Sequence, residues 1–165
     1  MSASYGLVAG RMRAAIVDLE RECQVLKREV QRLNTVTDAE LRSALIKGLA
    51  LDLQSLYTGA EHIFELVARQ VDFVEPSGES WRRELLSQMA AENSGVRPAV
   101  VSRELHSMLG ELLGFRHCIR SVYSFDIDEA KVLERAREAP RLCDRLIAEL
   151  GAAAESLERA TQGPV

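Results

Sequence analysis

The chain has 165 residues, of which 47% are hydrophobic and 28% are charged, and its formal net charge at pH 7 is -4. This composition is typical of a soluble globular protein and excludes a disordered or fibrous chain. The sequence contains no run of about 18 apolar residues, so no membrane span is predicted. The negative net charge argues against a protein that coats nucleic acid through charge alone. We expect a single domain over residues 1–165, with a core of about residues 7–157, in a cytoplasmic protein.

The first expected element is a helix over residues 7–33. Its apolar residues alternate spacings of four and three along one face, which is typical both of a helix packed in its own bundle and of a short dimer seam. Thr37 and Glu40 have the spacing of a capping box and predict the start of a second helix, which extends to about Asp72. The apolar face of the first helix consists of Met12, Ile16, Leu19, Cys23, Leu26, Val30 and Leu33.

Two clusters of turn-forming residues, 74–78 and 93–98, interrupt the chain after the second helix. Between them we expect a short third helix over residues 79–92. Ser102, with Glu104 in the first turn, predicts the cap of a fourth helix.

Asp128 predicts the N-cap of a last helix, which continues to about Leu157 and is kinked at Pro140. The sequence contains no internal repeat and no alternating run of β-branched residues. We therefore predict an all-α fold, an up-and-down helical bundle with one short inserted helix.

The cysteines and histidines do not form a metal-binding pattern. Cys23, Cys118 and Cys143 are odd in number and widely spaced, so we expect reduced, buried thiols rather than a disulfide framework. His62 and His106 lie on different expected helices without a cysteine or carboxylate at zinc-site spacing. No metal or cofactor is predicted.

Residues 115–123 read Phe-Arg-His-Cys-Ile-Arg-Ser-Val-Tyr and end the fourth expected helix. At about 100° per residue, Arg116, Arg120 and Tyr123 share one face. Guanidinium groups bind phosphate in a bidentate manner, so this face is a candidate phosphate- or RNA-binding site. The alternative is a pair of solvated arginines beside a packed tyrosine.

On the adjoining face, His117 and Ser121 form a pair four residues apart. An imidazole can transfer protons near neutral pH, so His117 is a candidate general base. The surrounding residues 96–125 also predict a local basic patch, because four arginines there face only two glutamates: Arg97, Arg103, Arg116, Arg120, Glu104 and Glu111.

Three blocks of the chain, over about residues 38–150, resemble a HepT-like protein of the HEPN superfamily. They read Leu-Tyr-Thr-Gly-Ala-Glu-His-Ile-Phe-Glu-Leu at 56–66, Pro-Ser-Gly-Glu-Ser-Trp-Arg-Arg-Glu-Leu-Leu at 76–86, and Arg-Pro-Ala-Val-Val-Ser at 97–102, which leads into Phe-Arg-His at 115–117. This resemblance implies a ribonuclease toxin that is paired with an MNT-type nucleotidyltransferase antitoxin. It also implies a homodimer in which the arginines of two protomers face one RNA-binding cleft.

The family signature is an arginine, four to six residues, a histidine, any residue and a tyrosine. By resemblance, Arg116 stabilises the scissile phosphate and Tyr123 lines the site or receives AMP from the nucleotidyltransferase. Ser121 occupies the position of the catalytic histidine, which is a departure from the signature. Tyr57 is similar to a mid-helix tyrosine of the family, and we expect it to pack in the bundle.

Two main functions stay open on these grounds. In the first, the chain is a metal-independent endoribonuclease in which His117 replaces the missing base. In the second, it is a catalytically impaired module that binds a nucleotidyltransferase and is modified on Tyr123. A structural helical adaptor is the remaining alternative.

Overall fold

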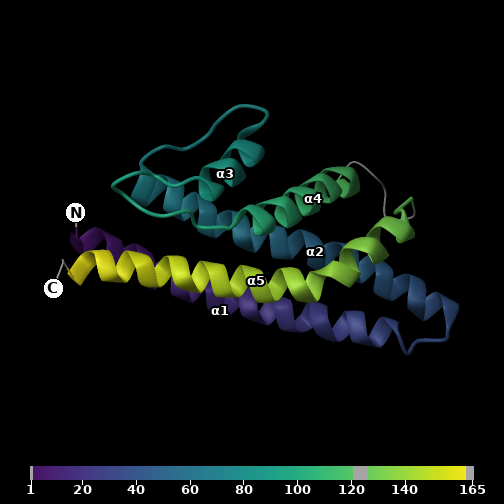
Figure 1. Cartoon of the computed structure of the whole chain (residues 1–165). Helices are drawn as coiled ribbons and strands as arrows, with labels where there is room; N and C mark the ends of the chain where they lie inside the picture. Colours follow the sequence, from purple (N-terminus) through teal and green to yellow (C-terminus); the bar gives the residue numbers. More distant parts are fainter. Residues whose placement is uncertain (1, 121–125, 163–165) are drawn as a thin grey trace.

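The computed structural model describes residues 2–120 and 126–162. In chain order it forms α1 (Ser2–Leu33), α2 (Ala39–Val67), the π-helix η1 (Ala68–Asp72), α3 (Trp81–Ala90), α4 (Arg103–Arg120) and α5 (Glu129–Gln162). Figure 1 shows that α1, α2 and α5 lie lengthwise beside one another, with α3 and α4 on α2. This architecture confirms the predicted all-α bundle with a short inserted helix. None of the described helices is long and apolar enough to cross a membrane.

The two outer helices are longer than expected. α1 begins at Ser2 rather than at about Leu7, and α5 reaches Gln162 rather than about Leu157. The two ends of the chain lie at the same end of the bundle, so the first turns of α1 pack on the last turns of α5 (Figure 1). Val8 and Ala9 are fully buried there. Mutual packing therefore extends both helices beyond the apolar stripe on which the prediction was based.

The stripe on α1 packs inside its own chain. Its residues are buried in the core, apart from Val30, which is half-buried against it. Of the two alternatives, the bundle interpretation is therefore the one that the structure supports. α1 approaches α2 closely at Gly59, where a Cβ atom would lie 2.8 Å from Cδ1 of Leu19. The missing side chain of Gly59 makes room for a buried leucine.

The helix starts follow the expected capping chemistry with one correction. Asp38, not Thr37, caps α2, because its side chain accepts a hydrogen bond from the Leu41 N–H at 2.8 Å. Ser102 caps α4 as predicted, since its Oγ accepts from the Leu105 N–H at 3.1 Å. Asp128 caps α5 in the same way, accepting from the Ala130 N–H at 3.1 Å.

The other helical segments also differ in detail from the sequence-based expectation. The second helix ends at Asp72 as expected, but its last five residues are a π-helix. α3 is shorter than predicted and runs over Trp81–Ala90. Pro140 lies inside α5, and Figure 1 shows the helix bending near this position, which agrees with the predicted kink.

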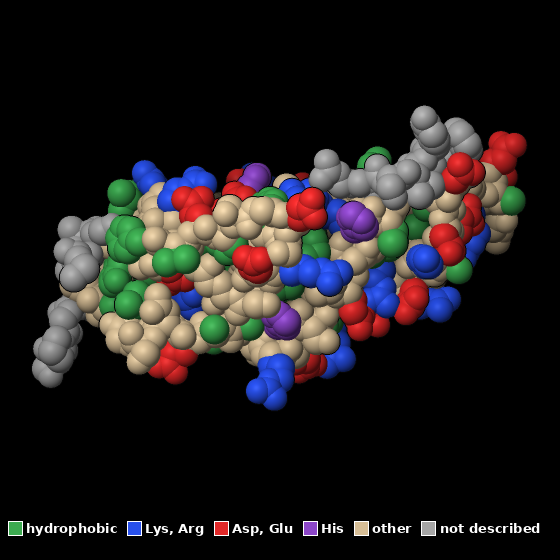
Figure 2. Space-filling model, turned by 90° about the horizontal axis from the view of Figure 1, so that it is seen from above, with side chains coloured by type: hydrophobic (Ala, Val, Ile, Leu, Met, Phe, Trp, Pro, Cys, Tyr) green, Lys and Arg blue, Asp and Glu red, His purple; other side chains and the backbone are tan. Residues whose placement is uncertain are grey.

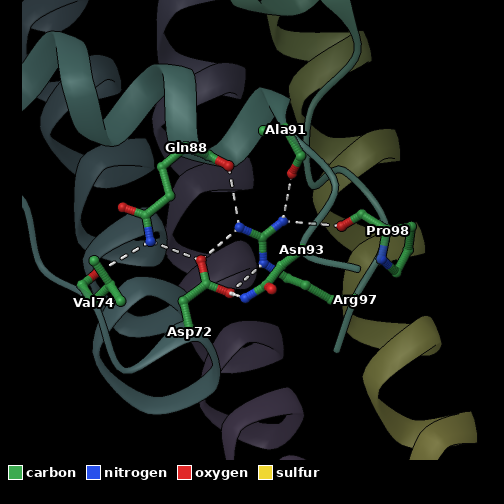
Figure 3. Close-up of polar contacts among 7 residues, drawn as sticks. All are labelled: Asp72, Val74, Gln88, Ala91, Asn93, Arg97 and Pro98. Carbon is green, nitrogen blue, oxygen red and sulfur yellow. Dashed lines mark hydrogen bonds and ion pairs between the residues drawn. The ribbon is translucent and has the colours of Figure 1, made fainter. Parts of the chain in front are cut away.

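A buried ion pair fixes the position of α3. Asp72, the last residue of η1, accepts two hydrogen bonds from Arg97, at 2.8 Å from Nε and 2.6 Å from Nη2, and both side chains are only 3% exposed (Figure 3). Arg97 also donates to the carbonyl oxygens of Gln88, Ala91 and Pro98. Its N–H donors are therefore all satisfied, and the end of α3 is held against η1.

The same carboxylate is completed by two amide side chains. Nε2 of Gln88 donates to Asp72 at 2.7 Å and Nδ2 of Asn93 donates at 3.1 Å. Burial raises the pKa of Asp72, but the hydrogen bonds from Arg97, Asn93 and Gln88 outweigh this effect and hold the pKa below its usual value. The sequence predicted that Arg97 belongs to a basic surface patch. This prediction is wrong, because the Arg97 side chain is buried and its hydrogen bonds go to Asp72 and to backbone carbonyl oxygens.

Arg97→Ala should lower the free energy of unfolding by about 3–5 kcal/mol, because Asp72 would keep its buried charge without a counterion. Urea denaturation measures this value. The control is Arg69→Ala, which removes an exposed pair with Glu75 and should change stability little.

The same variant should also respond differently to acid. The folded-state pKa of Asp72 lies below its unfolded value of about 4, so its stabilising contribution is complete above that pH and is lost as pH falls through the folded-state pKa. Removing Arg97 removes this depression, and stability should fall less steeply in acid. An unchanged acid slope together with an unchanged free energy of unfolding would contradict a structural role for the pair.

Candidate functional site

The candidate site lies at the C-terminal end of α4, where this helix passes over α2 and beside α3. Arg116 is half-buried on α4, and its guanidinium carbon lies 6.0 Å from the centre of the Tyr57 ring on α2. At this distance the ring face attracts the cation weakly. Arg116 is thus held against α2 instead of extending freely into solvent.

Tyr57 is 1% exposed, which confirms the expectation that it packs in the bundle. Burial and the nearby Glu61 carboxylate raise the pKa of its phenol far above the usual value, while Arg116 and Arg82 act in the opposite direction. Tyr57 is therefore a neutral side chain near neutral pH. Its ring is the surface of α2 that the Arg116 guanidinium approaches.

Glu61 lies one turn after Tyr57 on the same face of α2 and is 4% exposed. Its Oε2 lies 2.9 Å from Nε of Arg82 on α3. Burial raises the pKa of Glu61, and the charges of Arg82 and Arg116 only partly offset this effect. An arginine from α3 therefore pairs with this buried carboxylate, and the charge of an arginine from α4 also acts on it.

An open pocket of about 350 Å³ lies between the start of α3 and the end of α4. Arg82 and Arg83 line it from α3, and His117 lines it from α4. The remaining lining residues are Glu79, Ser80 and Leu113. A pocket with two guanidinium groups and one imidazole on its walls can bind a phosphate group.

Acidic side chains on α4 are engaged elsewhere. Glu104 pairs with Arg141 and Arg145 of α5, and Glu111 pairs with Arg135 of α5. Figure 2, seen from above α3 and α4, shows basic side chains interspersed with acidic ones over this face. The surface is therefore not uniformly basic. The positions on it that can bind an anion are the pocket and the vicinity of Arg116.

The structure tests only part of the predicted motif. It brings Arg116 and His117 to the α2–α3–α4 junction, with His117 on the pocket wall. Ser121 and Tyr123 lie outside the described residues, and of Arg120 only the backbone, as the last residue of α4, is described. The predicted helical face of Arg116, Arg120 and Tyr123 therefore stays a prediction.

The cysteines agree with expectation at two positions of three. Cys23 and Cys143 are buried, but Cys118 on α4 is exposed, so the expectation of a buried thiol is wrong there. Cys118 lies near the end of α4 and lines an open pocket of about 100 Å³ together with Phe115, Ile127 and Lys131. Within the described ranges, no three His, Cys, Asp or Glu side chains are grouped so that they could hold a metal ion.

Two residues of the site, Glu61 and Arg82, were not singled out as functional from the sequence. Glu61 could have been found, because it is a charged residue on the apolar face that includes Leu53, Tyr57 and Phe64. Arg82 gave no such signal, since two adjacent arginines at the start of an amphipathic helix are typical of a solvated surface. Its pairing depends on a partner 21 residues earlier in the chain.

Comparison with known proteins adds one finding. A family model described as a HepT-like protein matches residues 48–157 of the chain. The matched range holds every described residue that contributes to the junction and its pocket. Curated proteins and solved structures gave no match.

Proposed function

The chain belongs to the HepT-like family, and from this premise we propose that it is a HEPN-type toxin module with endoribonuclease activity. The observation that carries the proposal is the position of Arg116 and His117 at a junction that also presents Arg82 and Arg83. A site of this kind supplies positive charge and an imidazole without a bound metal. RNA carries the 2′-hydroxyl that such chemistry requires.

In the proposed reaction the 2′-oxygen of RNA attacks the adjacent phosphorus while the bond to the 5′-oxygen breaks. A base accepts the 2′-hydroxyl proton, an acid donates a proton to the leaving 5′-oxygen, and the products end in a 2′,3′-cyclic phosphate and a 5′-hydroxyl. Arg116 stabilises the additional negative charge on the phosphorane. Arg120 binds a neighbouring phosphate from the end of the helix.

His117 is the proposed base, since Ser121 has no group that accepts a proton at neutral pH. In the helix that the sequence predicts, residues 117 and 121 are one turn apart, so an imidazole at either position would serve the same side. His117 also lines the pocket, and this position supports its proposed role beside a bound phosphodiester. Tyr123 completes the motif as a residue that lines the site.

The proposed partner is an MNT-type nucleotidyltransferase antitoxin, and the proposed assembly is a homodimer. In the transfer of AMP, the phenolic oxygen of Tyr123 attacks the α-phosphorus of ATP, loses its proton and releases pyrophosphate. The added AMP would bring a phosphodiester charge beside Arg116 and Arg120 and occupy the cations that RNA needs. The replacement of the signature histidine by Ser121 favours a second candidate function. In that case the chain is a catalytically impaired module that still engages the nucleotidyltransferase.

Cleavage of RNA by the wild type and two variants separates these functions. If His117 is the base, wild-type protein cuts RNA in the presence of a chelator and leaves 2′,3′-cyclic ends, and His117→Ala reduces the rate by about 10²- to 10⁴-fold. In this case Ser121→His adds little. If Ser121 has disabled the site, Ser121→His should raise cleavage by about tenfold or more.

Arg116→Ala should reduce cleavage by about 10²- to 10³-fold in either background, because it removes charge stabilisation of the phosphorane. Arg103→Ala, at the opposite end of the same helix, is the matched control and should retain activity. A wild type and a Ser121→His variant that both leave RNA intact would contradict the nuclease function and favour the impaired module.

Incubation with ATP and the cognate nucleotidyltransferase should add the mass of one adenylyl group to the chain. Tyr123→Phe should abolish the addition, because the phenol supplies the attacking oxygen. Intact-mass spectrometry makes the measurement, and Tyr57→Phe is the control because the Tyr57 ring is buried. Addition that persists in Tyr123→Phe would contradict this assignment.

The exposed thiol of Cys118 gives a test of the proposed dimer. We expect a dimer in sedimentation at micromolar concentration, with both Arg116 sites near one groove. A bismaleimide with a flexible spacer should then link two protomers through Cys118, while the buried Cys23 and Cys143 react slowly. Cys118→Ser is the control. A monomer, or a dimer that is not linked, would show that the two motifs do not face each other.

A further inference from the structure

The described residues include one acid–arginine pair that is buried on both sides and a second in which a buried glutamate meets a partly exposed arginine. In the Asp72–Arg97 pair every donor of the arginine has an acceptor, and the pKa of Asp72 is lowered. In the Glu61–Arg82 pair the two nearest atoms are 2.9 Å apart, but Oε2 and Nε are not aligned for a hydrogen bond and have no other partner among the described residues. Only the first pair has the geometry of a purely structural contact.

One face of the Arg82 guanidinium packs on the Trp81 ring, and the side chain is partly exposed to the pocket. Its guanidinium carbon lies 4.2 Å from the centre of the Trp81 ring, which limits the orientations of the side chain. The side chain is 31% exposed and lines the pocket that also contains His117. Within the described ranges no hydrogen bond occupies its terminal nitrogens, so they are available to a ligand in the pocket.

Arg82 and Arg116 both act on the buried carboxylate of Glu61. Glu65 also lies near enough to influence Glu61, and Glu79 lies on the pocket wall. With Arg83, which lines the same pocket, three guanidinium groups stand against these three carboxylates. The charges of these groups balance, so the capacity for an anion rests on the two arginines that line the open pocket, Arg82 and Arg83.

We propose that Arg82 is a second phosphate-binding residue of the site, which binds the RNA backbone beside Arg116, and that Glu61 is the positioning residue of Arg82. This inference rests on the proposed RNA-cleaving function and adds α3 to the site. A guanidinium whose Nε side lies against a carboxylate can present its two terminal nitrogens as a fork, which matches two oxygens of a phosphodiester.

The first test is binding of a single-stranded RNA oligonucleotide whose 2′-O-methyl groups prevent cleavage. Arg82→Gln should weaken binding by about tenfold or more, the value expected for loss of a charge-assisted hydrogen bond. It should also reduce the slope of log affinity against log salt by about 0.7, which corresponds to one lost phosphate contact. Arg82→Lys should restore the slope but only part of the affinity.

The matched control is Arg103→Gln, which removes the same charge from an exposed position at the far end of α4. It should leave both the affinity and the salt slope unchanged. If Arg82→Gln and Arg103→Gln behave alike while wild-type protein binds and cuts RNA, the role of Arg82 is overturned and the ribonuclease function stands.

The variant Glu61→Gln tests whether Glu61 positions Arg82 for RNA or only stabilises the fold. Burial makes the Glu61 charge costly, so this substitution should keep or raise the thermal midpoint while it weakens RNA binding by about threefold or more. The double variant Glu61→Gln/Arg82→Gln should bind no more weakly than Arg82→Gln alone, because the glutamate acts through that arginine. A lower thermal midpoint with unchanged RNA binding would show that Glu61 is only structural.

A second ligand keeps the inference independent of RNA cleavage. Inorganic phosphate should raise the thermal midpoint of wild-type protein, and this increase should be lost in Arg82→Gln and kept in Arg103→Gln. Protein that responds to phosphate through Arg82 but never binds RNA would retain the anion site and overturn the proposed ribonuclease. Protein in which Arg82 affects neither RNA nor phosphate would overturn the anion site itself.

Discussion

The buried contact between Asp72 and Arg97 determines where α3 lies, and the candidate site depends on that position. α3 has only ten residues and buries three apolar side chains, so its own packing is a limited anchor. Arg97 ties the carbonyl oxygens at the end of this helix to the carboxylate at the end of η1. With its C-terminal end fixed, α3 presents Arg82 over α2 and faces His117 across the pocket.

The second acid–arginine pair, Glu61 and Arg82, is less completely hydrogen-bonded than the pair of Asp72 and Arg97. Asp72 accepts four hydrogen bonds from side chains, whereas Oε2 of Glu61 has none within the described ranges. Because Arg82 is partly exposed and Oε2 of Glu61 has no hydrogen bond within the described ranges, this pair should contribute less to stability than the pair of Asp72 and Arg97. Its position beside Arg116 and the pocket supports the proposed interaction with a ligand.

The sequence predicted the helices well because each carries its apolar stripe over several turns, and long periodic patterns determine the type of an element. The helix boundaries were less certain where two neighbouring residues could both act as the N-cap. Thr37 and Asp38 are such a pair, and the backbone geometry decides that Asp38 caps α2. The motif directed attention to Arg116 and His117. Arg82 and Arg97 could not be interpreted from their neighbours, because burial and partners that lie 21 and 25 residues away decide their roles.

In the proposed site, the binding of charge and the transfer of protons are assigned to different residues. The described contacts of Arg116 and Arg82 are with Tyr57, Trp81 and Glu61. If the site acts as proposed, a serine at the signature position removes a base, while these described contacts do not depend on position 121. Anion binding and partner recognition can persist when catalysis is reduced, and the departure at position 121 is compatible with an intact HepT-like scaffold.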